Sequence, residues 1–382
     1  MNNKEFNAKE DLVMFVDASR NRSGGSVVYL RNFFNYFDFK KTRIKKIIIC
    51  SNKNVLQELQ DTKNIVHYSH SFLEKNLLFQ IFWQLFILPC YLKKMKIDLL
   101  YTTDSSTFCI FKPSVVFNQD ILAFDTNTLK KLPLNFSKVR LFLIKFIQIR
   151  AMNNANHIIF LSQFSKNFIS NYLRQNLNYS IIPHGREYVE KKFVKSSWHF
   201  NNDITLLYVS PILKYKNHEI VVKSYENLKK KKKNLKIKFI GKIYDRKLYN
   251  ELISKYKSIN EKNFMGEIDH KEVKKYIKQS DIFIFASNSE TFGITLLEAM
   301  TQGIPIICSN QSSLPEILED GGLYFDPSSQ IELSEKIDLL INDIILRKAL
   351  SRKAMKISKK YSWEKNLNSF YKIINKNFDL NS

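Results

Sequence analysis

The sequence predicts an α/β protein with two doubly wound parallel sheets. Short segments rich in Ile, Val, Phe and Tyr alternate with helical segments, a pattern typical of parallel sheets with helical crossovers. The chain has 382 residues, more than one hydrophobic core usually serves, and 44% of them are hydrophobic. Two domains are therefore expected. The clearest predicted strands are residues 46–50, 99–102, 114–117, 158–161, 205–209 and 236–240.

The predicted domain boundary follows Gly185. Residues 187–203 are polar and lack apolar periodicity, as a connection between two domains would. We therefore predict one domain in residues 1–185, a second in residues 186–360, and a terminal helix within residues 361–382. Near the amino end, a helix over residues 27–37 follows the turn Ser23-Gly24-Gly25.

A strand, a loop and a helix near residue 290 form the most informative segment. The apolar run 282–286 leads into E-T-F-G-I-T-L-L-E, which begins at Glu290 and ends at Glu298. A helix is predicted over residues 293–302, because Gly303 and Pro305 end the periodic pattern. The next apolar run, 304–309, completes a βαβ unit, and such units bind ligands at the carboxyl ends of their strands.

The amino end of this helix is predicted to bind an anion. The first amides, at Gly293, Ile294 and Thr295, have no carbonyl partner in the helix and carry the positive end of its dipole. They suit a diphosphate, and Gly293 allows close approach. Two glutamates eight residues apart occur by chance in many helices. Beside an anion site, however, Glu298 on the helix and Glu290 on the loop are placed to bind a ribose and a sugar.

These residues resemble a known family. Residues 280–327, SDIFIFASNSETFGITLLEAMTQGIPIICSNQSSLPEILEDGGLYFDP, resemble the donor-binding half of retaining glycosyltransferases of the GT-B fold, the group 1 or family 4 class. The same family's features are matched by residues 206–211, Lys216-Asn217-His218, residues 155–162, the turn 182–185 and Ser23-Gly24-Gly25. The resemblance covers nearly the whole chain. It implies two Rossmann-like domains facing a central cleft, with the last helix packing back on the first domain.

The resemblance also assigns roles. It implies that Lys216 meets the leaving diphosphate, that Glu290 holds sugar hydroxyls and that Glu298 holds the ribose. An ordinary surface lysine remains the alternative for Lys216, and generic turns remain open for Gly241 and Gly266. The assigned catalytic residues are Glu290, Lys216 and Asp120, and the assigned donor-binding residues are Glu298, Gly293, Ile294, Thr295, Gly25, Gln119 and Gly266.

Three positions depart from the family pattern. Ser210-Pro211 stands where many members carry Gly-Arg, so a second cation for the phosphates is missing unless Lys214 substitutes. Gln119 stands where a histidine is usual, and glutamine cannot exchange a proton near neutral pH. His184 replaces the usual asparagine of the crossover turn, where a lone histidine is more often structural than catalytic.

No metal or other cofactor is expected. The sequence has no D-x-D pair to hold a metal on a diphosphate, and charge compensation is expected from cations and amides of the protein. Its four cysteines, Cys50, Cys90, Cys109 and Cys308, lie in or beside apolar segments without a C-x-x-C pair. This usage indicates a reducing cytoplasm and argues against a thiolate metal site.

The net charge of +24, from 60 basic and 36 acidic residues, indicates an anionic partner. Nucleic acid is not expected, because no nucleic-acid-binding signature surrounds the basic runs 229–233 and 138–146. Part of the excess is attributable to compositional drift toward Lys, and an anionic membrane surface explains the rest better. The aromatic stretch 77–92 is too short and too polar to span a bilayer, which leaves a buried helix or one lying in the lipid interface.

The expected function combines these observations. With no signal peptide evident at the start, we expect a cytoplasmic protein, peripheral on the inner face of a bacterial membrane. It would transfer a hexosyl unit, with retention, from a nucleotide-diphosphate sugar to a saccharide or lipid-linked saccharide acceptor in surface polysaccharide or glycan assembly. Two alternatives remain: a nucleotide-sugar 2-epimerase of the same fold, and a non-catalytic relic that binds sugar nucleotides.

Overall fold

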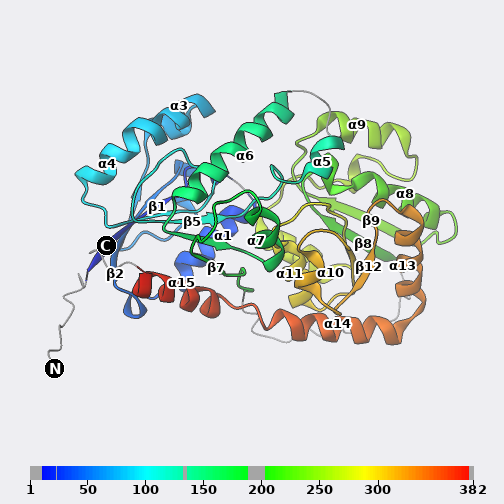
Figure 1. Ribbon diagram of the computed structural model, residues 1–382. Helices are drawn as coiled ribbons and strands as arrows, with labels where there is room; N and C mark the ends of the chain where they lie inside the picture. Colours follow the sequence, from blue (N-terminus) through cyan, green and yellow to red (C-terminus); the bar gives the residue numbers. More distant parts are fainter. Residues whose placement is uncertain (1–10, 23, 132–135, 188–202, 378–382) are drawn as a thin grey trace. The chain divides into compact units, whose positions relative to one another are not determined.

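The computed structural model describes residues 11–22, 24–131, 136–187 and 203–377, and two compact units are distinguished (Figure 1). Unit 1 comprises Met1–Phe124, Pro133–Gly185 and Ser362–Ser382, and unit 2 comprises Asp125–Leu132 and Arg186–Tyr361. Each unit is built on a sheet whose strands pair in parallel. The predicted α/β class is confirmed.

The described sheet of unit 1 has seven strands in the order β3-β2-β1-β4-β5-β6-β7. Its strands are β1 (Leu12–Asp17), β2 (Ile44–Cys50), β3 (Ile65–Tyr68), β4 (Leu99–Thr102), β5 (Ser114–Asn118), β6 (His157–Phe160) and β7 (Tyr179–Ile181). The chain first runs outward from β1 to β3 and then returns to continue from β4 to β7. The order therefore reverses between β1 and β4, which creates a switch point at the carboxyl edge.

Helices cover both faces of this sheet (Figure 1). Because parallel crossovers are right-handed, connections that run in opposite directions along the sheet lie on opposite faces. One face carries α3 (Leu77–Phe82), a π-helical turn (Trp83–Ile87), α4 (Leu88–Lys94), α6 (Phe136–Asn154) and α7 (Gln163–Ser170). The other face carries α1 (Gly25–Tyr36), α2 (Lys53–Gln57) and α15 (Trp363–Asn377).

Aromatic side chains join α15 to its neighbours in unit 1. The Phe370 ring lies 5.2 Å from the Phe33 ring of α1 and 5.0 Å from the Tyr101 ring of β4. At the start of the helix, Trp363 lies 5.7 Å from Tyr29, again between ring centroids. These contacts explain why the last described helix groups with the first part of the chain rather than with the segment that precedes it.

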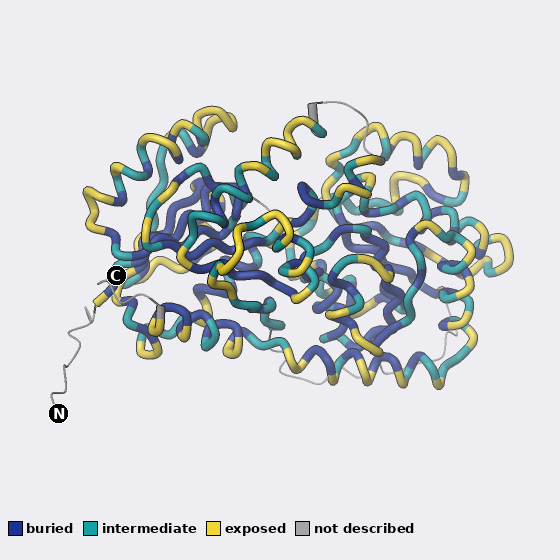
Figure 2. Tube along the Cα trace, in the orientation of Figure 1, coloured by how far each residue is buried: buried dark blue, intermediate teal, exposed yellow. Residues whose placement is uncertain are grey.

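The described sheet of unit 2 has five strands in the order β12-β11-β10-β8-β9. Its strands are β8 (Ile204–Val209), β9 (Leu235–Ile240), β10 (Ile282–Phe285), β11 (Ile306–Ser309) and β12 (Leu323–Phe325). The helices of this unit are α5 (Thr126–Lys131), α8 (His218–Lys229), α9 (Arg246–Lys255), α10 (His270–Gln279), α11 (Ile294–Gln302), α12 (Leu314–Leu318), α13 (Gln330–Asn342) and α14 (Ile344–Ser358). The switch point lies between β8 and β10. Every residue of β10 and all but one residue of β8 are buried (Figure 2).

Some expectations need correction. The first helix begins at Gly25, two residues before the predicted start, because Gly24 with φ 66° already serves as its N-cap. Asp125–Leu132 groups with unit 2, although the prediction placed all of residues 1–185 in the first domain. This segment contains α5, the short helix between β5 and α6. The order of the strands does not require such a helix to pack on the sheet of unit 1. Most of the predicted connecting segment 187–203 lies outside the described residues.

The aromatic stretch 77–92 is neither a fully buried helix nor a fully exposed one. It is divided into α3, the π-helical turn and α4, with Pro89 in the first turn of α4. Trp83 and Leu88 are completely buried, whereas Phe82 and Phe86 are 48% and 59% exposed. The buried-helix interpretation therefore describes the inward side of this segment, and the outward side is exposed, as the interfacial-helix interpretation requires. In the part of the chain that the structure describes, no helix has the length and apolarity needed to span a bilayer.

Gly241 should be far more sensitive to substitution than Gly266. Gly241 has φ 147°, and a Cβ atom there would lie 2.2 Å from the carbonyl oxygen of Ser210. We expect Gly241→Ala to lower the free energy of unfolding of unit 2 by about 2–4 kcal/mol, from backbone strain and steric overlap. Gly266→Ala is the matched control, because Gly266 has φ 68° but no atom within 4 Å of the added Cβ. It should cost about 1–2 kcal/mol in denaturant titrations, and equal losses would contradict the steric argument.

Candidate functional site

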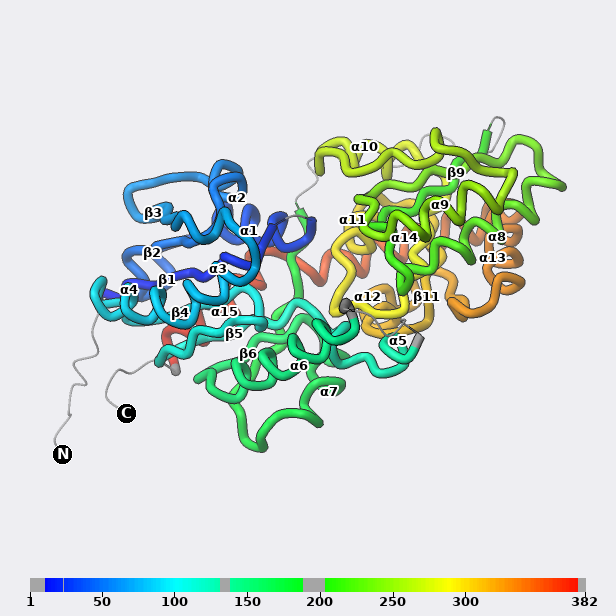
Figure 3. The backbone as a smooth tube through the Cα atoms, turned by 90° about the horizontal axis from the view of Figure 1, so that it is seen from above, coloured from blue at the N-terminus to red at the C-terminus, as the bar shows by residue number. Residues whose placement is uncertain are grey.

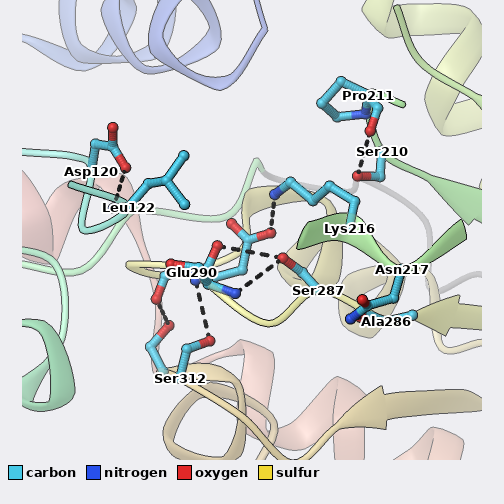
Figure 4. A network of polar contacts seen from close by, with 12 residues as sticks. Asp120, Leu122, Ser210, Pro211, Lys216, Asn217, Ala286, Ser287, Glu290 and Ser312 are labelled. Carbon is cyan, nitrogen blue, oxygen red and sulfur yellow. Dashed lines mark hydrogen bonds and ion pairs between the residues drawn. The ribbon is translucent and has the colours of Figure 1, made fainter. Parts of the chain in front are cut away.

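The loops that follow β8 and β10 meet at the switch point of unit 2. After β8 the chain forms a 3-10 turn at Lys214–Lys216, and Asn217 then adopts a left-handed conformation with φ 54°. Its side-chain Nδ2 donates hydrogen bonds to the Ala286 carbonyl at 2.7 Å and to Asn288 Oδ1 at 2.8 Å. The Asn288 amide in turn donates to the Tyr215 carbonyl at 2.9 Å. These bonds fix one loop against the other, and Figure 4 shows Asn217 beside Ala286.

Lys216 and Glu290 form an ion pair between these loops. The Lys216 Nζ donates to Glu290 Oε1, and the two side chains are only 10% and 16% exposed (Figure 4). Burial alone would lower the pKa of Lys216, but the Glu290 carboxylate, with smaller contributions from Tyr215 and Tyr208, raises it above its usual value. The lysine therefore stays charged across the neutral range. The structure brings together two residues that the sequence assigned to one site.

Serine hydroxyls fix the backbone of Glu290. The Glu290 amide donates to Ser312 Oγ at 3.2 Å, and Ser313 Oγ donates to the Glu290 carbonyl at 3.0 Å (Figure 4). Both serines follow β11, so three neighbouring strand ends contribute to this position. The carboxylate consequently projects from a loop with little freedom to move. Sequence analysis did not single out either serine.

The amino end of α11 begins three residues after Glu290. Gly293 is its N-cap with φ 88°, and none of the described side chains caps the helix there. The amides of Ile294 and Thr295 are in the first turn, where a helix supplies no carbonyl partner. A first turn without a capping side chain leaves these donors for an anion. This is the geometry that the sequence predicted for a diphosphate.

Glu298 has a partner that the sequence did not predict. Its Oε1 contacts the Nε2 atom of His270, at the start of α10, and both side chains are about 15% exposed. Among the described residues, Glu298 Oε2 is buried without a hydrogen-bond partner. Glu187 lies 3.9 Å from His270 Nδ1 and pairs with Lys274. A lone histidine 28 residues from Glu298 carries no sequence signal for such a contact.

Gly266 lies at the same edge of the sheet. Its carbonyl accepts a hydrogen bond from the Gly241 amide at 2.8 Å, which ties the turn to the end of β9. Both glycines have positive φ, so each satisfies a backbone requirement rather than marking an arbitrary turn. The role of Gly266 in donor binding stays a prediction.

Three assigned residues belong to unit 1. Gly25 is exposed and is the first residue of α1, while Ser23 of the same turn lies outside the described residues. Gln119 donates from Nε2 to the Thr103 carbonyl at 2.6 Å, which links the ends of β4 and β5. Asp120 is exposed, and its Oδ1 accepts from the Leu122 amide at 2.8 Å. The side chains of Gln119 and Asp120 therefore have structural contacts within their own unit.

Metal ligation receives no support from the described side chains. Within residues 11–22, 24–131, 136–187 and 203–377, no group of three or more His, Cys, Asp or Glu is arranged to hold a metal ion. The charged groups described at the switch point of unit 2 are an ammonium and carboxylates.

Comparison with known proteins identifies the segment that carries this site. Residues 189–357 match the family model of glycosyl transferases group 1. This segment is therefore assigned to the group 1 glycosyltransferases. The matched segment contains Lys216, Glu290 and Glu298, so the residues that define the site lie within the family domain.

Curated relatives agree with this family. An uncharacterized glycosyltransferase of Methanocaldococcus jannaschii is 28% identical over 217 residues, which are 56% of this chain and 58% of the relative. The alpha-monoglucosyldiacylglycerol synthase of Acholeplasma laidlawii is 28% identical over 207 residues, or 50% of this chain and 51% of the relative. The matched regions thus span little more than half the length of these relatives.

The GT-B fold is supported by solved structures. HepE of Anabaena, crystallised with UDP and glucose, has a TM-score of 0.72 at 16% identity and covers 97% of this chain and 100% of its own. At this identity the similarity concerns the fold. The predicted GT-B glycosyltransferase fold, with two Rossmann-like parallel-sheet domains, is confirmed.

His218 should make the stability of unit 2 sensitive to acid. The histidine follows the Lys216 loop and is completely buried, 4.8 Å from the Tyr208 ring and 5.7 Å from the Phe239 ring. Burial lowers the pKa of His218 to about 3. The unfolded chain, with a histidine pKa of about 6.5, then binds more protons as the pH falls from about 6.5 toward 3, so the folded state loses stability in that window.

The variant His218→Phe tests this dependence. At pH 5 the neutral, buried histidine should cost about 2 kcal/mol relative to pH 7, and the phenylalanine variant should lack that share of the acid sensitivity. Denaturant titrations of parent and variant at both pH values measure the difference. An unchanged pH dependence in the variant would show that His218 does not titrate as its burial implies.

Proposed function

We propose that this glycosyltransferase transfers a hexosyl unit from a nucleotide-diphosphate sugar to an acceptor hydroxyl, with retention at the anomeric carbon. The observation that carries the proposal is the placement of Lys216, Glu290 and the first turn of α11 at one switch point inside the family segment. Nucleotide-sugar binding is supported by the structural similarity to HepE, which was crystallised with UDP and glucose.

The leaving diphosphate requires stabilisation by positive charge. The bond between the anomeric carbon and the diphosphate oxygen breaks while the sugar ring gains cationic character. In this proposal the Lys216 ammonium and the amides of Ile294 and Thr295 stabilise the departing anion. Such preorganised charge is often the largest contribution to catalysis. The acceptor oxygen then bonds to the anomeric carbon from the side of the leaving group, and its proton passes to a diphosphate oxygen.

The two glutamates are assigned different contacts. Glu290 would hold sugar hydroxyls, and Glu298 would bind the ribose through Oε2, the oxygen left without a partner among the described residues. In the free chain Lys216 and Glu290 neutralise one another. A donor would replace that pairing by giving the ammonium a diphosphate and the carboxylate a set of hydroxyls. The exchange keeps both buried charges partnered throughout binding.

For unit 1 we propose three contributions that follow from the family resemblance. Asp120 is assigned to catalysis, and Gly25 and Gln119 are assigned to the donor. Gln119 donates one amide hydrogen to the Thr103 carbonyl, and its proposed contribution is a hydrogen bond with a sugar hydroxyl rather than acid/base work. Gly25 carries no side chain and offers a backbone amide in the first turn of α1.

The proposed acceptor is a saccharide or a lipid-linked saccharide used in bacterial surface polysaccharide or glycan assembly. The name of the Acholeplasma laidlawii relative, an alpha-monoglucosyldiacylglycerol synthase, supports a lipid-linked acceptor. We accordingly place the enzyme in the cytoplasm, peripheral on the inner face of the membrane, where its net charge of +24 favours anionic lipid.

Kinetics of three variants test the assigned roles. Glu298→Gln should mainly raise KM for the donor, because a ribose contact is made in ground and transition state alike. Glu290→Gln should lower kcat more than it changes KM if its contact tightens as the sugar becomes cationic. Lys216→Ala should lower kcat/KM by an amount equivalent to about 2–4 kcal/mol, since the ammonium meets the leaving group in a partly dry site.

His270→Asn serves as a companion to Glu298→Gln. If His270 orients the Glu298 carboxylate toward the ribose, the variant should raise donor KM about five- to tenfold with little change in kcat. This is the size expected for the loss of one hydrogen bond. Product analysis by mass spectrometry separates transfer from epimerisation of the donor sugar. Transfer at the parental rate by all of these variants would place the site elsewhere, and binding without turnover in the parent would indicate a relic.

Transfer should proceed without added metal. The proposed charge compensation comes from Lys216 and the α11 amides, so nucleotide release should keep its full rate in EDTA. The measurement compares initial rates in EDTA, in Mg²⁺ and in Mn²⁺ at equal ionic strength. Complete loss of activity in EDTA that either metal restores would overturn the metal-free mechanism.

A further inference from the structure

Two helical segments of unit 1 carry rows of exposed apolar side chains. On α6, Phe142, Leu143 and Phe146 are 72%, 56% and 65% exposed. On α3 and the π-helical turn, Leu78 and Phe86 are 74% and 59% exposed. We call these rows the aromatic face, which comprises Leu78, Phe82, Leu85 and Phe86 together with Val139, Phe142, Leu143 and Phe146. Groups of exposed large apolar side chains of this kind are typical of interaction sites.

The helices that carry the two rows, α3 and α6, lie on the same side of the unit 1 sheet (Figure 1), and Figure 3 shows the same region from above. The loop after β4 connects them. The Phe108 amide donates to Gln84 Oε1 of the π-helical turn at 3.3 Å. The Phe108 carbonyl accepts from Arg150 Nη1 of α6, also at 3.3 Å. The rows are therefore held in a fixed relation to one another.

The core does not require these side chains. The inward side of the α3–α4 segment already places Trp83, Leu88 and Leu92 in the core with no exposure. The inward side of α6 places Met152 there, with Ile144 and Ile149 packed against the same cluster. Figure 2 shows the outer parts of α3 and α6 as exposed. The outward rows are additional apolar surface.

Within the two segments that carry the rows, the charged residues are all basic. Neither residues 77–94 nor residues 136–154 contain an Asp or a Glu. The exposed cations within or beside the rows are Lys75, Lys93, Lys94, Lys96 and Arg140, and the exposed acid beside Lys75 is Glu74, which accepts a hydrogen bond from the Lys53 amide. A second copy of the chain would bring like charges together on this face, and a nucleic acid would leave the aromatic rows unused. A bilayer with anionic headgroups satisfies both the cations and the apolar side chains.

We propose that the aromatic face docks on an anionic lipid surface, with the phenylalanines inserted at the level of the headgroups and the cations against them. This inference deepens the proposed function, on which it rests for its purpose, because it assigns the surface through which the enzyme reaches a lipid-linked acceptor. The docking residues belong to unit 1, whereas the proposed donor contacts Lys216, Glu290 and Glu298 belong to unit 2. Docking and donor binding can therefore be tested separately.

Vesicle cosedimentation tests the proposal on the full chain. The parent should bind vesicles of equimolar phosphatidylglycerol and phosphatidylcholine, bind phosphatidylcholine alone much less, and dissociate in about 1 M salt. Phe142→Ser/Phe146→Ser should lower the partition coefficient about tenfold or more, because two inserted rings are lost. Lys93→Gln/Lys94→Gln should lower it up to about 25-fold, taking about fivefold for each charge near anionic lipid.

Matched controls come from unit 2. Ile331→Ser/Ile345→Ser removes apolar side chains that are 71% and 78% exposed, and Lys230→Gln/Lys231→Gln removes two exposed lysines. Both controls should bind vesicles like the parent. Equal losses in controls and face variants, equal binding to neutral vesicles, or no binding to either would overturn the proposal. Concentration-dependent dimerisation abolished by Phe142→Ser/Phe146→Ser would assign the face to a second copy instead.

Donor binding distinguishes failure of this inference from failure of the proposed function. Thermal stabilisation by UDP-glucose and other nucleotide sugars, measured without lipid, should be the same in parent and Phe142→Ser/Phe146→Ser. Stabilisation without vesicle binding would leave the transferase proposal standing and remove the docking face. Vesicle binding without stabilisation by any nucleotide sugar would support the docking face and contradict the transferase proposal.

Discussion

The ion pair between Lys216 and Glu290 is the interaction on which the proposed donor site depends. A buried charge without a partner is costly, and the Glu290 carboxylate raises the pKa of the buried Lys216, so the ammonium remains charged. The pair is possible because β8 and β10, which precede the two residues, are hydrogen-bonded neighbours although 74 residues separate Lys216 from Glu290. The parallel sheet thus creates a preformed cation at its carboxyl edge, and the hydrogen bonds of Asn217 and the serines hold that arrangement before any ligand arrives.

Much of the fold is predictable because its signals are local. The strand predicted over residues 205–209 is Ile204–Val209 in the structure, and the helix predicted over residues 293–302 is Ile294–Gln302. Continuous apolar runs mark buried parallel strands, and Gly303, which has φ 64°, marks the end of α11. Lys216 and Glu290 were assigned to one site through the family resemblance rather than through spacing. Only the packed sheet explains physically why they meet.

The features that the sequence could not supply arise from contacts between distant segments. His270 contacts Glu298 because α10 packs beside α11, and Gly241 is needed because the loops after β8 and β9 approach closely. A helix that is apolar on both sides gives no indication of which side meets the core. In α6 and in the α3–α4 segment, sequence pattern therefore left the outward phenylalanines indistinguishable from core residues.

The location of the charge matters more than its total. The lysine block 229–233, conspicuous in the sequence, lies in unit 2 at the end of α8, where Lys232 forms an ion pair with Asp338 at 3.1 Å. Basic residues that are paired with acidic neighbours attract an anionic partner only weakly. By contrast, the α3–α4 and α6 segments combine exposed rings with cations and contain no acid. Because insertion of rings and attraction of headgroups act on the same surface, their free energies add there, whereas the lysine block has only a screened charge to contribute.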